Sequence, residues 1–270
     1  MTWTQEQLDI QALAHEFAEG ELRGDSGAWD SARDLQEGVF GKLAELGFLG
    51  MLIPEEFGGL DFDLGTYLLV LEELAWGDAS VALSVAIHNG PVSSLLLRYG
   101  SDEQKQRWLP QLALGALMGA FALSEPEAGS DAGSISTKAE RSDSGWSLNG
   151  EKRWVTNGCR AGLVIVFART GEDGISAFLV SPDTDGYAVG ARESTMGFRA
   201  SQTVSVKLDG VQLGAEALLG DLGRGLPYAL EALDLGRVGI AAQAVGGRLA
   251  WWTACIFRNH LGRCIRRWVQ

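Results

Sequence analysis

FALSEPEAGSD, residues 121–131, followed by KRWVTNG, residues 152–158, is the most informative part of this chain. FAL reads as the end of a strand, and the Pro, Gly and Ser residues after it favour a loop. Trp154 and Thr156 are two residues apart, so on a regular strand both side chains lie on one face. A strand that runs into a loop is common in β-rich domains, so either stretch alone is unspecific.

In this order and at this separation, the two stretches resemble the flavin-binding signature of the acyl-CoA dehydrogenase family. The resemblance implies FAD as cofactor. It also implies that Ser130 lies between the cofactor and the thioester of an acyl-CoA substrate. The cofactor contacts that it implies are made by the matching residues: Phe121, Leu123, Ser124, Ser130, Trp154, Val155 and Thr156.

The residue types in these stretches suit a flavin. Leu123 and Ser124 can offer main-chain groups and a hydroxyl to the polar edge of the ring. The small residues at 128–130 leave room for a pyrophosphate and can donate N–H groups to it. Trp154 offers a flat apolar face. Glu127 departs from the family, which commonly has glycine there, and a carboxylate beside a pyrophosphate is unfavourable unless it points into solvent.

Composition and charge argue against several classes of protein. The 270 residues carry a formal net charge of −13, whereas nucleic-acid binding needs a basic face. No run of about 18 apolar residues is evident, so we expect no membrane span. The N-terminus has no basic segment followed by an apolar one, which predicts a cytoplasmic protein.

The histidines and cysteines show no metal-ligand spacing, so we expect no metal site. The histidines are predicted to be solvated or packed, and Cys159 to be a reduced, partly buried thiol. The residues concerned are His15, His88, His260, Cys159, Cys255 and Cys264.

Hydrophobic spacing predicts helices over residues 1–115. Thr4 with Gln7, and Ser101 with Gln104, have the spacing of capping boxes at helix starts. We expect this part to be an N-terminal helical domain that buries a shared apolar surface.

The spacing changes over residues 116–225, where short segments rich in β-branched and aromatic residues alternate with Ser-Gly, Asn-Gly and Asp-Gly turn signals. Strands of this kind predict a small β-barrel or sandwich. The segments are LMGAFAL, GWSLNG, KRWVTN, LVIVFAR, ISAFLV, YAVGARE and TVSVKLDGVQL. Helical spacing returns over residues 226–246, so the fold class is α+β: a helical domain, a small β-barrel domain, and the start of a truncated C-terminal helical domain.

The same family has this α, β, α order, and ALDLGRVGIAAQAVG, residues 232–246, resembles the opening helix of its C-terminal domain. The resemblance implies that four residues of this helix lie beside the acyl-CoA: Asp234, Leu235, Gly236 and Arg237. From the sequence pattern alone, Asp234 and Arg237 also read as a solvated ion pair three residues apart.

Residues 247–270 depart from this pattern, with five arginines and no acidic residue. So abrupt a change resembles translation in a wrong reading frame. We therefore predict an aberrant basic tail that packs against no particular surface. A basic amphipathic tail that binds membranes or calmodulin is the alternative, although its aromatic residues do not form one apolar face.

The resemblance implies that a carboxylate removes a proton α to the thioester while a hydride leaves the β carbon for FAD, which gives a trans-2-enoyl-CoA. Relatives place this glutamate in the C-terminal domain or at the position of Gly236. The prediction is therefore no catalytic base and an inactive, truncated chain. The intact form would use an acyl-CoA whose chain the sequence does not fix: short, medium, branched and aryl acyl groups stay open, and ALDLGRVGIAAQAVG favours short or medium straight chains. It would pass electrons to an electron-transfer flavoprotein and form a homo-oligomer, either a dimer or a tetramer. The alternatives are a non-catalytic fragment that binds FAD or acyl-CoA, and an inert product of a frameshifted gene.

Overall fold

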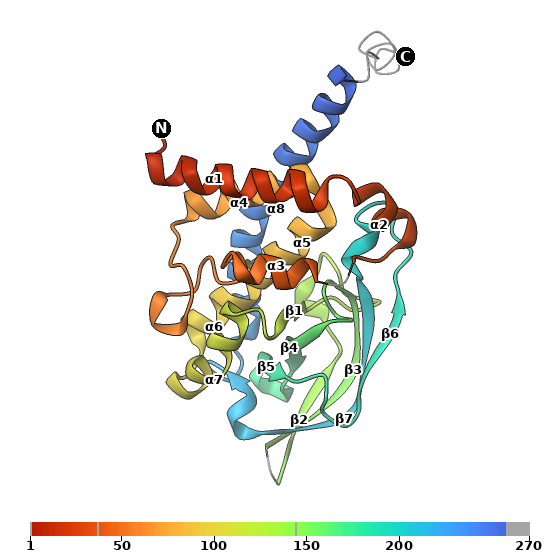
Figure 1. The fold of residues 1–270 in the computed structure, drawn as a ribbon. Helices are drawn as coiled ribbons and strands as arrows, with labels where there is room; N and C mark the ends of the chain where they lie inside the picture. The colour runs from red at the N-terminus through yellow and green to blue at the C-terminus, as the bar shows by residue number, and fades with distance from the viewer. Residues whose placement is uncertain (1, 37, 144, 258–270) are drawn as a thin grey trace.

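A computed structural model describes residues 2–36, 38–143 and 145–257. It shows an array of helices, a sheet beside that array, and one long C-terminal helix that packs against both (Figure 1). The α+β class and the order of its parts are as the sequence predicts.

The helices of the array begin where the sequence places their caps. The side chains of Thr4 and Ser101 accept from the backbone of Gln7 and Gln104, whose side chains bond back in return. Both predicted capping boxes are therefore confirmed. The helices are α1 (Gln5–Phe17), α2 (Ser26–Ala32), α3 (Val39–Glu45), α4 (Leu64–Gly77), α5 (Ala79–Ile87), α6 (Ser94–Tyr99) and α7 (Asp102–Ala113), with π-helical turns η1 (Ala18–Leu22) and η3 (His88–Ser93).

α4 and α5 form the centre of the array. α4 packs against α1 on one side and against the C-terminal helix on another, and its buried residues include Val70, Leu71 and Leu74. The stretch Ala79–Tyr99 is long and apolar enough to cross a membrane, contrary to the expectation that no such run exists, but 78% of its most apolar window is buried inside the fold. That burial is typical of a core helix, so the stretch is weak evidence for a membrane span.

The strands form one mixed sheet of two halves that fold over a shared core. In one half β6, β7, β3 and β2 pair antiparallel, and in the other β1 pairs parallel with β4, which continues to β5 and β8. A single parallel pair, Lys138 with Arg169, joins the halves. The strands are β1 (Met118–Ala122), β2 (Lys138–Ser142), β3 (Gly145–Val155), β4 (Ala161–Arg169), β5 (Ile175–Val180), β6 (Tyr187–Arg192), β7 (Val204–Gly214) and β8 (Leu218–Leu219).

β3 differs from the prediction, because GWSLNG and KRWVTN form one strand rather than two. Asn149 and Gly150, expected to turn the chain, lie instead where the pairing of β3 with β7 shifts register. A β-bulge needs the same permissive backbone as a turn. A Cβ atom at Gly150 would lie 2.4 Å from Oγ1 of Thr137, so a side chain does not fit there.

β4 and β5 are buried on both faces, which explains their continuous apolar sequences. Val164 and Val166 of β4 face the core between the two halves of the sheet. Ile165 and Phe167 face the other way, toward a second core that α6, α7 and the C-terminal helix share. The sheet is thus anchored to the helices through its central strands.

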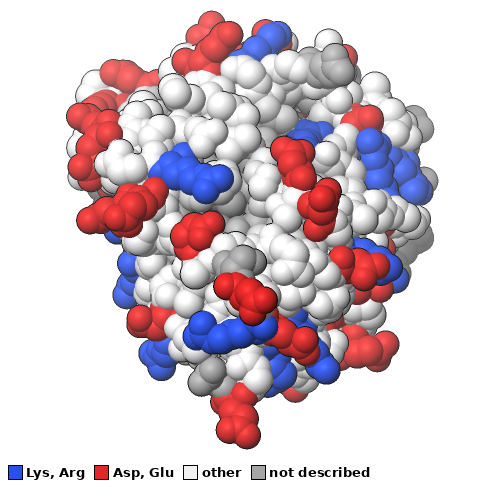
Figure 2. Space-filling model, turned by 90° about the horizontal axis from the view of Figure 1, so that it is seen from below, with Lys and Arg blue, Asp and Glu red and all other residues white. Residues whose placement is uncertain are grey.

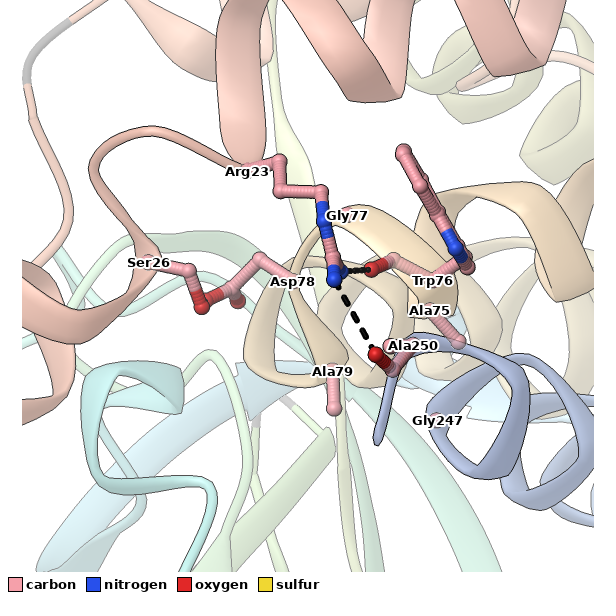
Figure 3. A pocket seen from close by; sticks show the side chains of 9 residues that line it. All are labelled: Arg23, Ser26, Ala75, Trp76, Gly77, Asp78, Ala79, Gly247 and Ala250. Carbon is pink, nitrogen blue, oxygen red and sulfur yellow. Dashed lines mark hydrogen bonds between the residues drawn. The ribbon is translucent and has the colours of Figure 1, made fainter. Parts of the chain in front are cut away.

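The C-terminal helix, α8 (Gly225–Phe257), has no break at residue 247, where the composition changes. Arg23 donates from Nη1 to the Trp76 carbonyl at 2.7 Å and from Nη2 to the Ala250 carbonyl at 3.0 Å (Figure 3). With Gly247, these residues line a cavity of about 460 Å³. The prediction that the chain from residue 247 packs against no surface is therefore wrong at Ala250, which Arg23 contacts. Residues 258–270, most of the predicted tail, lie outside the described residues.

Candidate functional site

The two quoted stretches lie side by side at the ends of β1 and β3. The backbone N–H of Arg153 donates to the Ser124 carbonyl at 2.9 Å. Nζ of Lys152 donates to the Leu123 carbonyl at 3.0 Å. The fold therefore brings together the two groups of residues that the sequence singles out as one site.

A buried ion pair joins the stretches. Nζ of Lys152 lies 2.7 Å from Oε1 of Glu125, and the two side chains are 0% and 3% exposed. Glu125 also accepts from the backbone of Ser136 at 2.5 Å and of Thr137 at 2.9 Å. Burial by itself raises the pKa of Glu125, but the ammonium of Lys152 and these donors outweigh it and lower the pKa to about 2. Glu125 is therefore ionised at neutral pH.

The loop after Glu125 is a tight turn. The N–H of Glu125 donates to the Ala128 carbonyl at 2.9 Å, and the N–H of Ala128 donates back at 3.2 Å. Ala128 is buried beneath the turn, whereas Pro126 and Glu127 are exposed. Glu127 therefore points into solvent, the condition under which a carboxylate near a pyrophosphate is not unfavourable.

Several polar groups of the stretches have no partner. Within the described residues, neither the Ser124 nor the Ser130 hydroxyl makes a hydrogen bond. A Cβ atom built at Gly129 would meet nothing within 4 Å, so the backbone of this loop is open to approach. The loop therefore offers hydroxyl groups and accessible backbone to a ligand.

The segment Trp154–Thr156 has an unusual backbone. Trp154 has a left-handed φ of 55° and is 51% exposed, whereas Val155 is fully buried in the core of the sheet. Thr156 lies beyond the end of β3, partly buried, with its hydroxyl 3.5 Å from that of Thr203. We expected a regular strand with Trp154 and Thr156 on one face, but the strand is interrupted at Trp154. Both residues are nevertheless more exposed than Val155. Phe121, the remaining predicted contact, is partly buried on β1 against Phe167.

Asn157 was not predicted as a site residue, although it lies within KRWVTNG. It is fully buried with a left-handed φ of 65°. Its Nδ2 donates to the Ser84 carbonyl at 3.0 Å and to the Gly119 carbonyl at 3.1 Å. Asn157 therefore ties the end of this segment to α5 and to β1 together. Its neighbours are Gly and Thr, so no hydrophobic pattern marks it as buried.

His88 is packed, one of the two states predicted for the histidines, and it ties η3 to the same strand. The N–H of Gly119 donates to Nδ1 of His88 at 2.9 Å, so Nδ1 carries no proton and Nε2 donates to the Leu112 carbonyl at 3.1 Å. Complete burial lowers the pKa of His88 to about 4. The imidazole is therefore neutral at physiological pH.

The predicted substrate residues Asp234, Leu235, Gly236 and Arg237 all lie on α8. Asp234 and Arg237 pair with each other and are largely exposed, which is the solvated pair that the sequence also allowed. Gly236 faces Pro91 of η3, where an added Cβ would lie 3.7 Å from the proline ring. In the described part of the chain, no hydrogen bond or ion pair joins the residues 234–237 to either stretch.

The sequence also makes predictions about metal-ligand clusters and the distribution of charge. Among the described residues, no group of three or more His, Cys, Asp or Glu is placed to hold a metal ion. On the face shown in Figure 2, acidic and basic side chains are intermixed. Cys159 is a free thiol but is exposed in the turn after β3, so its predicted partial burial is wrong. Cys264 and His260 lie outside the described residues, as does the side chain of Cys255.

Family models match both folded parts of the chain. The model of the acyl-CoA dehydrogenase N-terminal domain matches residues 4–116, and that of the acyl-CoA dehydrogenase middle domain matches residues 120–211. The chain belongs to the acyl-CoA dehydrogenase family. The first match covers the helical array and the second covers most of the sheet, so the predicted family is confirmed.

Individual acyl-CoA dehydrogenases agree with this assignment. The mitochondrial short-chain specific acyl-CoA dehydrogenase of Rattus norvegicus is 39% identical over 241 residues, which cover 88% of this chain and 58% of that protein. The structure of butyryl-CoA dehydrogenase from Megasphaera elsdenii is 36% identical with a TM-score of 0.90, over 93% of this chain and 67% of that one. A glutaryl-CoA dehydrogenase from Mycobacterium smegmatis, solved in complex with FADH2, is 37% identical with a TM-score of 0.85, over 90% and 62%. The chain spans less than two thirds of the rat protein's length.

Proposed function

We propose that this chain binds FAD against the joined ends of β1 and β3. The observation that carries the proposal is the junction itself: Lys152 and Arg153 hold Leu123 and Ser124 beside the Trp154 segment. Free hydroxyl groups and an exposed indole face remain available there, which suits a flavin. The residues that would hold the cofactor are Phe121, Leu123, Ser124, Ser130, Trp154, Val155 and Thr156. When bound, FAD supplies the acceptor for a hydride.

The substrate class that we propose is a short-chain acyl-CoA. The rat and Megasphaera relatives, which are named for short-chain and butyryl substrates, support this class. The residues that match those beside the thioester and the acyl-CoA in the family are Ser130, Asp234, Leu235, Gly236 and Arg237. An electron-transfer flavoprotein as electron acceptor and a homo-oligomer are part of the same proposal.

We further propose that these 270 residues do not dehydrogenate acyl-CoA by themselves. Removal of the α proton needs a carboxylate within reach of the substrate. At the position before Arg237, where some relatives carry that base, this chain has Gly236, which has no side chain. The chain would thus retain the cofactor side of the site without this base, as a non-catalytic FAD-binding protein would.

Flavin content and flavin reduction test the two parts separately. The chain purified in the presence of FAD should retain flavin after gel filtration. Anaerobic addition of butyryl-CoA should leave the flavin absorbance unbleached. A chain without retained flavin contradicts the binding proposal, and bleaching at enzymatic rates contradicts the proposed lack of a base.

A further inference from the structure

Trp154 has a backbone conformation that a bulky residue avoids. Its φ is 55°, and three residues later Asn157 has a φ of 65°. Left-handed conformations of such residues persist only where the surrounding structure imposes them, and they gather at binding sites. The segment between them, Val155 and Thr156, is therefore held in place rather than merely continued from β3.

Buried polar side chains hold this segment at both ends. Before Trp154, the Lys152 ammonium donates to Glu125 at 2.7 Å and to the Leu123 carbonyl at 3.0 Å. After it, the Asn157 amide donates to α5 and β1. Lys152 bonds the chain just after β1, and Asn157 bonds β1 itself and α5, so together they fix the position of the Trp154 segment relative to the end of β1.

Stability alone does not account for the ion pair. Replacing a buried ion pair with apolar side chains of similar volume is often neutral or stabilising. What an apolar pair cannot do is direct two hydrogen bonds from one side chain at fixed angles. Lys152 donates to the Leu123 carbonyl and to the Glu125 carboxylate at once, so it fixes the position of the chain on both sides of Ser124.

We propose that Lys152 and Glu125 are positioning residues that hold the Leu123–Ser124 edge and the Trp154 segment in register for the flavin. Neither side chain reaches the surface, so each acts through the residues that it holds. The inference rests on the proposed FAD binding.

Three variants test it: Lys152→Met, Glu125→Gln and the two combined. Among variants that keep the far-UV circular dichroism of the native chain, each single change should raise the Kd for FAD at least tenfold and shift the absorbance maxima of the bound flavin. The combined change should raise the Kd by less than the product of the two, because the pair acts as one unit. A folded Lys152→Met or combined variant with the native Kd and flavin spectrum overturns the proposal.

Two controls separate positioning from general effects. Lys207→Met removes the ammonium of an exposed pair, Lys207 with Asp209 at 3.1 Å, on the strand beside β3. Leu74→Ala weakens the core of α4, where Leu74 is fully buried. Both should bind FAD within twofold of the native chain, and Leu74→Ala should do so despite a lower Tm. An equal loss of FAD affinity in Leu74→Ala shows a general loss of stability and overturns the proposal.

Hydrogen–deuterium exchange without FAD distinguishes failure of this inference from failure of the proposed function. If the native chain binds no FAD, the proposed function is wrong and exchange decides the inference alone. Exchange at residues 121–125 and 153–157 should be at least tenfold faster in Lys152→Met than in Lys207→Met. If Lys152→Met does not fold, the same comparison is made with the combined variant. Native exchange rates at both segments overturn the proposal.

Discussion

Lowering the pH from 6.5 to 4 should destabilise the fold through His88. The imidazole is fully buried and accepts from the Gly119 backbone, so protonation at Nδ1 would break that bond inside the core. Burial lowers the pKa of His88 from 6.5 to about 4. Between these values the unfolded chain binds a proton that the folded chain does not. Stability therefore falls as the pH falls, by up to about 1.4 kcal/mol per pH unit and roughly 3 kcal/mol in total.

Urea unfolding at pH values from 7 to 4 measures this effect, with His88→Gln as the reference. The variant lacks the titrating group, so the difference in free energy of unfolding between the native chain and the variant isolates His88 from the carboxylates. That difference should be largest at pH 7 and should shrink by roughly 3 kcal/mol toward pH 4. A difference that does not change with pH would refute a buried, neutral imidazole that makes a hydrogen bond at each ring nitrogen.

Two further predictions concern stability. Gly246→Ala should destabilise by about 3 kcal/mol, because the new Cβ would lie 2.0 Å from the Glu72 carbonyl of α4. In Gly247→Ala the new Cβ would meet nothing within 4 Å, so this variant should be neutral or stabilising by up to about 1 kcal/mol. Equal melting temperatures for the two variants would contradict the close approach of α8 to α4. Lys152→Met should lower the free energy of unfolding in urea by about 3 to 5 kcal/mol, because it leaves a buried carboxylate unpaired. Lys207→Met should lower it by less than about 1 kcal/mol. A similarly small loss in both variants would contradict a buried pair.

Local signals predicted much of the fold. The capping boxes at Thr4 and Ser101 form because each needs only residues within one helical turn. The change of hydrophobic spacing located the sheet. β4 and β5 could be predicted without knowing their neighbouring strands, because burial on both faces makes their sequences continuously apolar. β2, KAERS, was missed because four of its five residues are polar and only Ala139 is buried.

The positions of the candidate site residues needed long-range information. The sequence placed Trp154 and the FALSEPEAGSD stretch in one site by resemblance, but it gave no sign that Lys152 and Glu125 are buried together. A lysine and a glutamate 27 residues apart read as solvated side chains until the fold pairs them. At the Asn-Gly pair within β3, the sequence predicted a turn that does not form. The pair lies instead at a bulge in one continuous strand, which accepts the same residues.

Titration of the purified chain with FAD, alongside Trp154→Ala, tests the proposed flavin site most directly. Trp154 is 51% exposed, so its removal deletes an aromatic face without opening a cavity in the core. The native chain should bind FAD, and Trp154→Ala should raise the Kd at least fivefold, which corresponds to about 1 kcal/mol for an aromatic stacking contact. Equal FAD affinity of the two proteins would contradict the site, and no FAD binding by the native chain would contradict the function proposed for it.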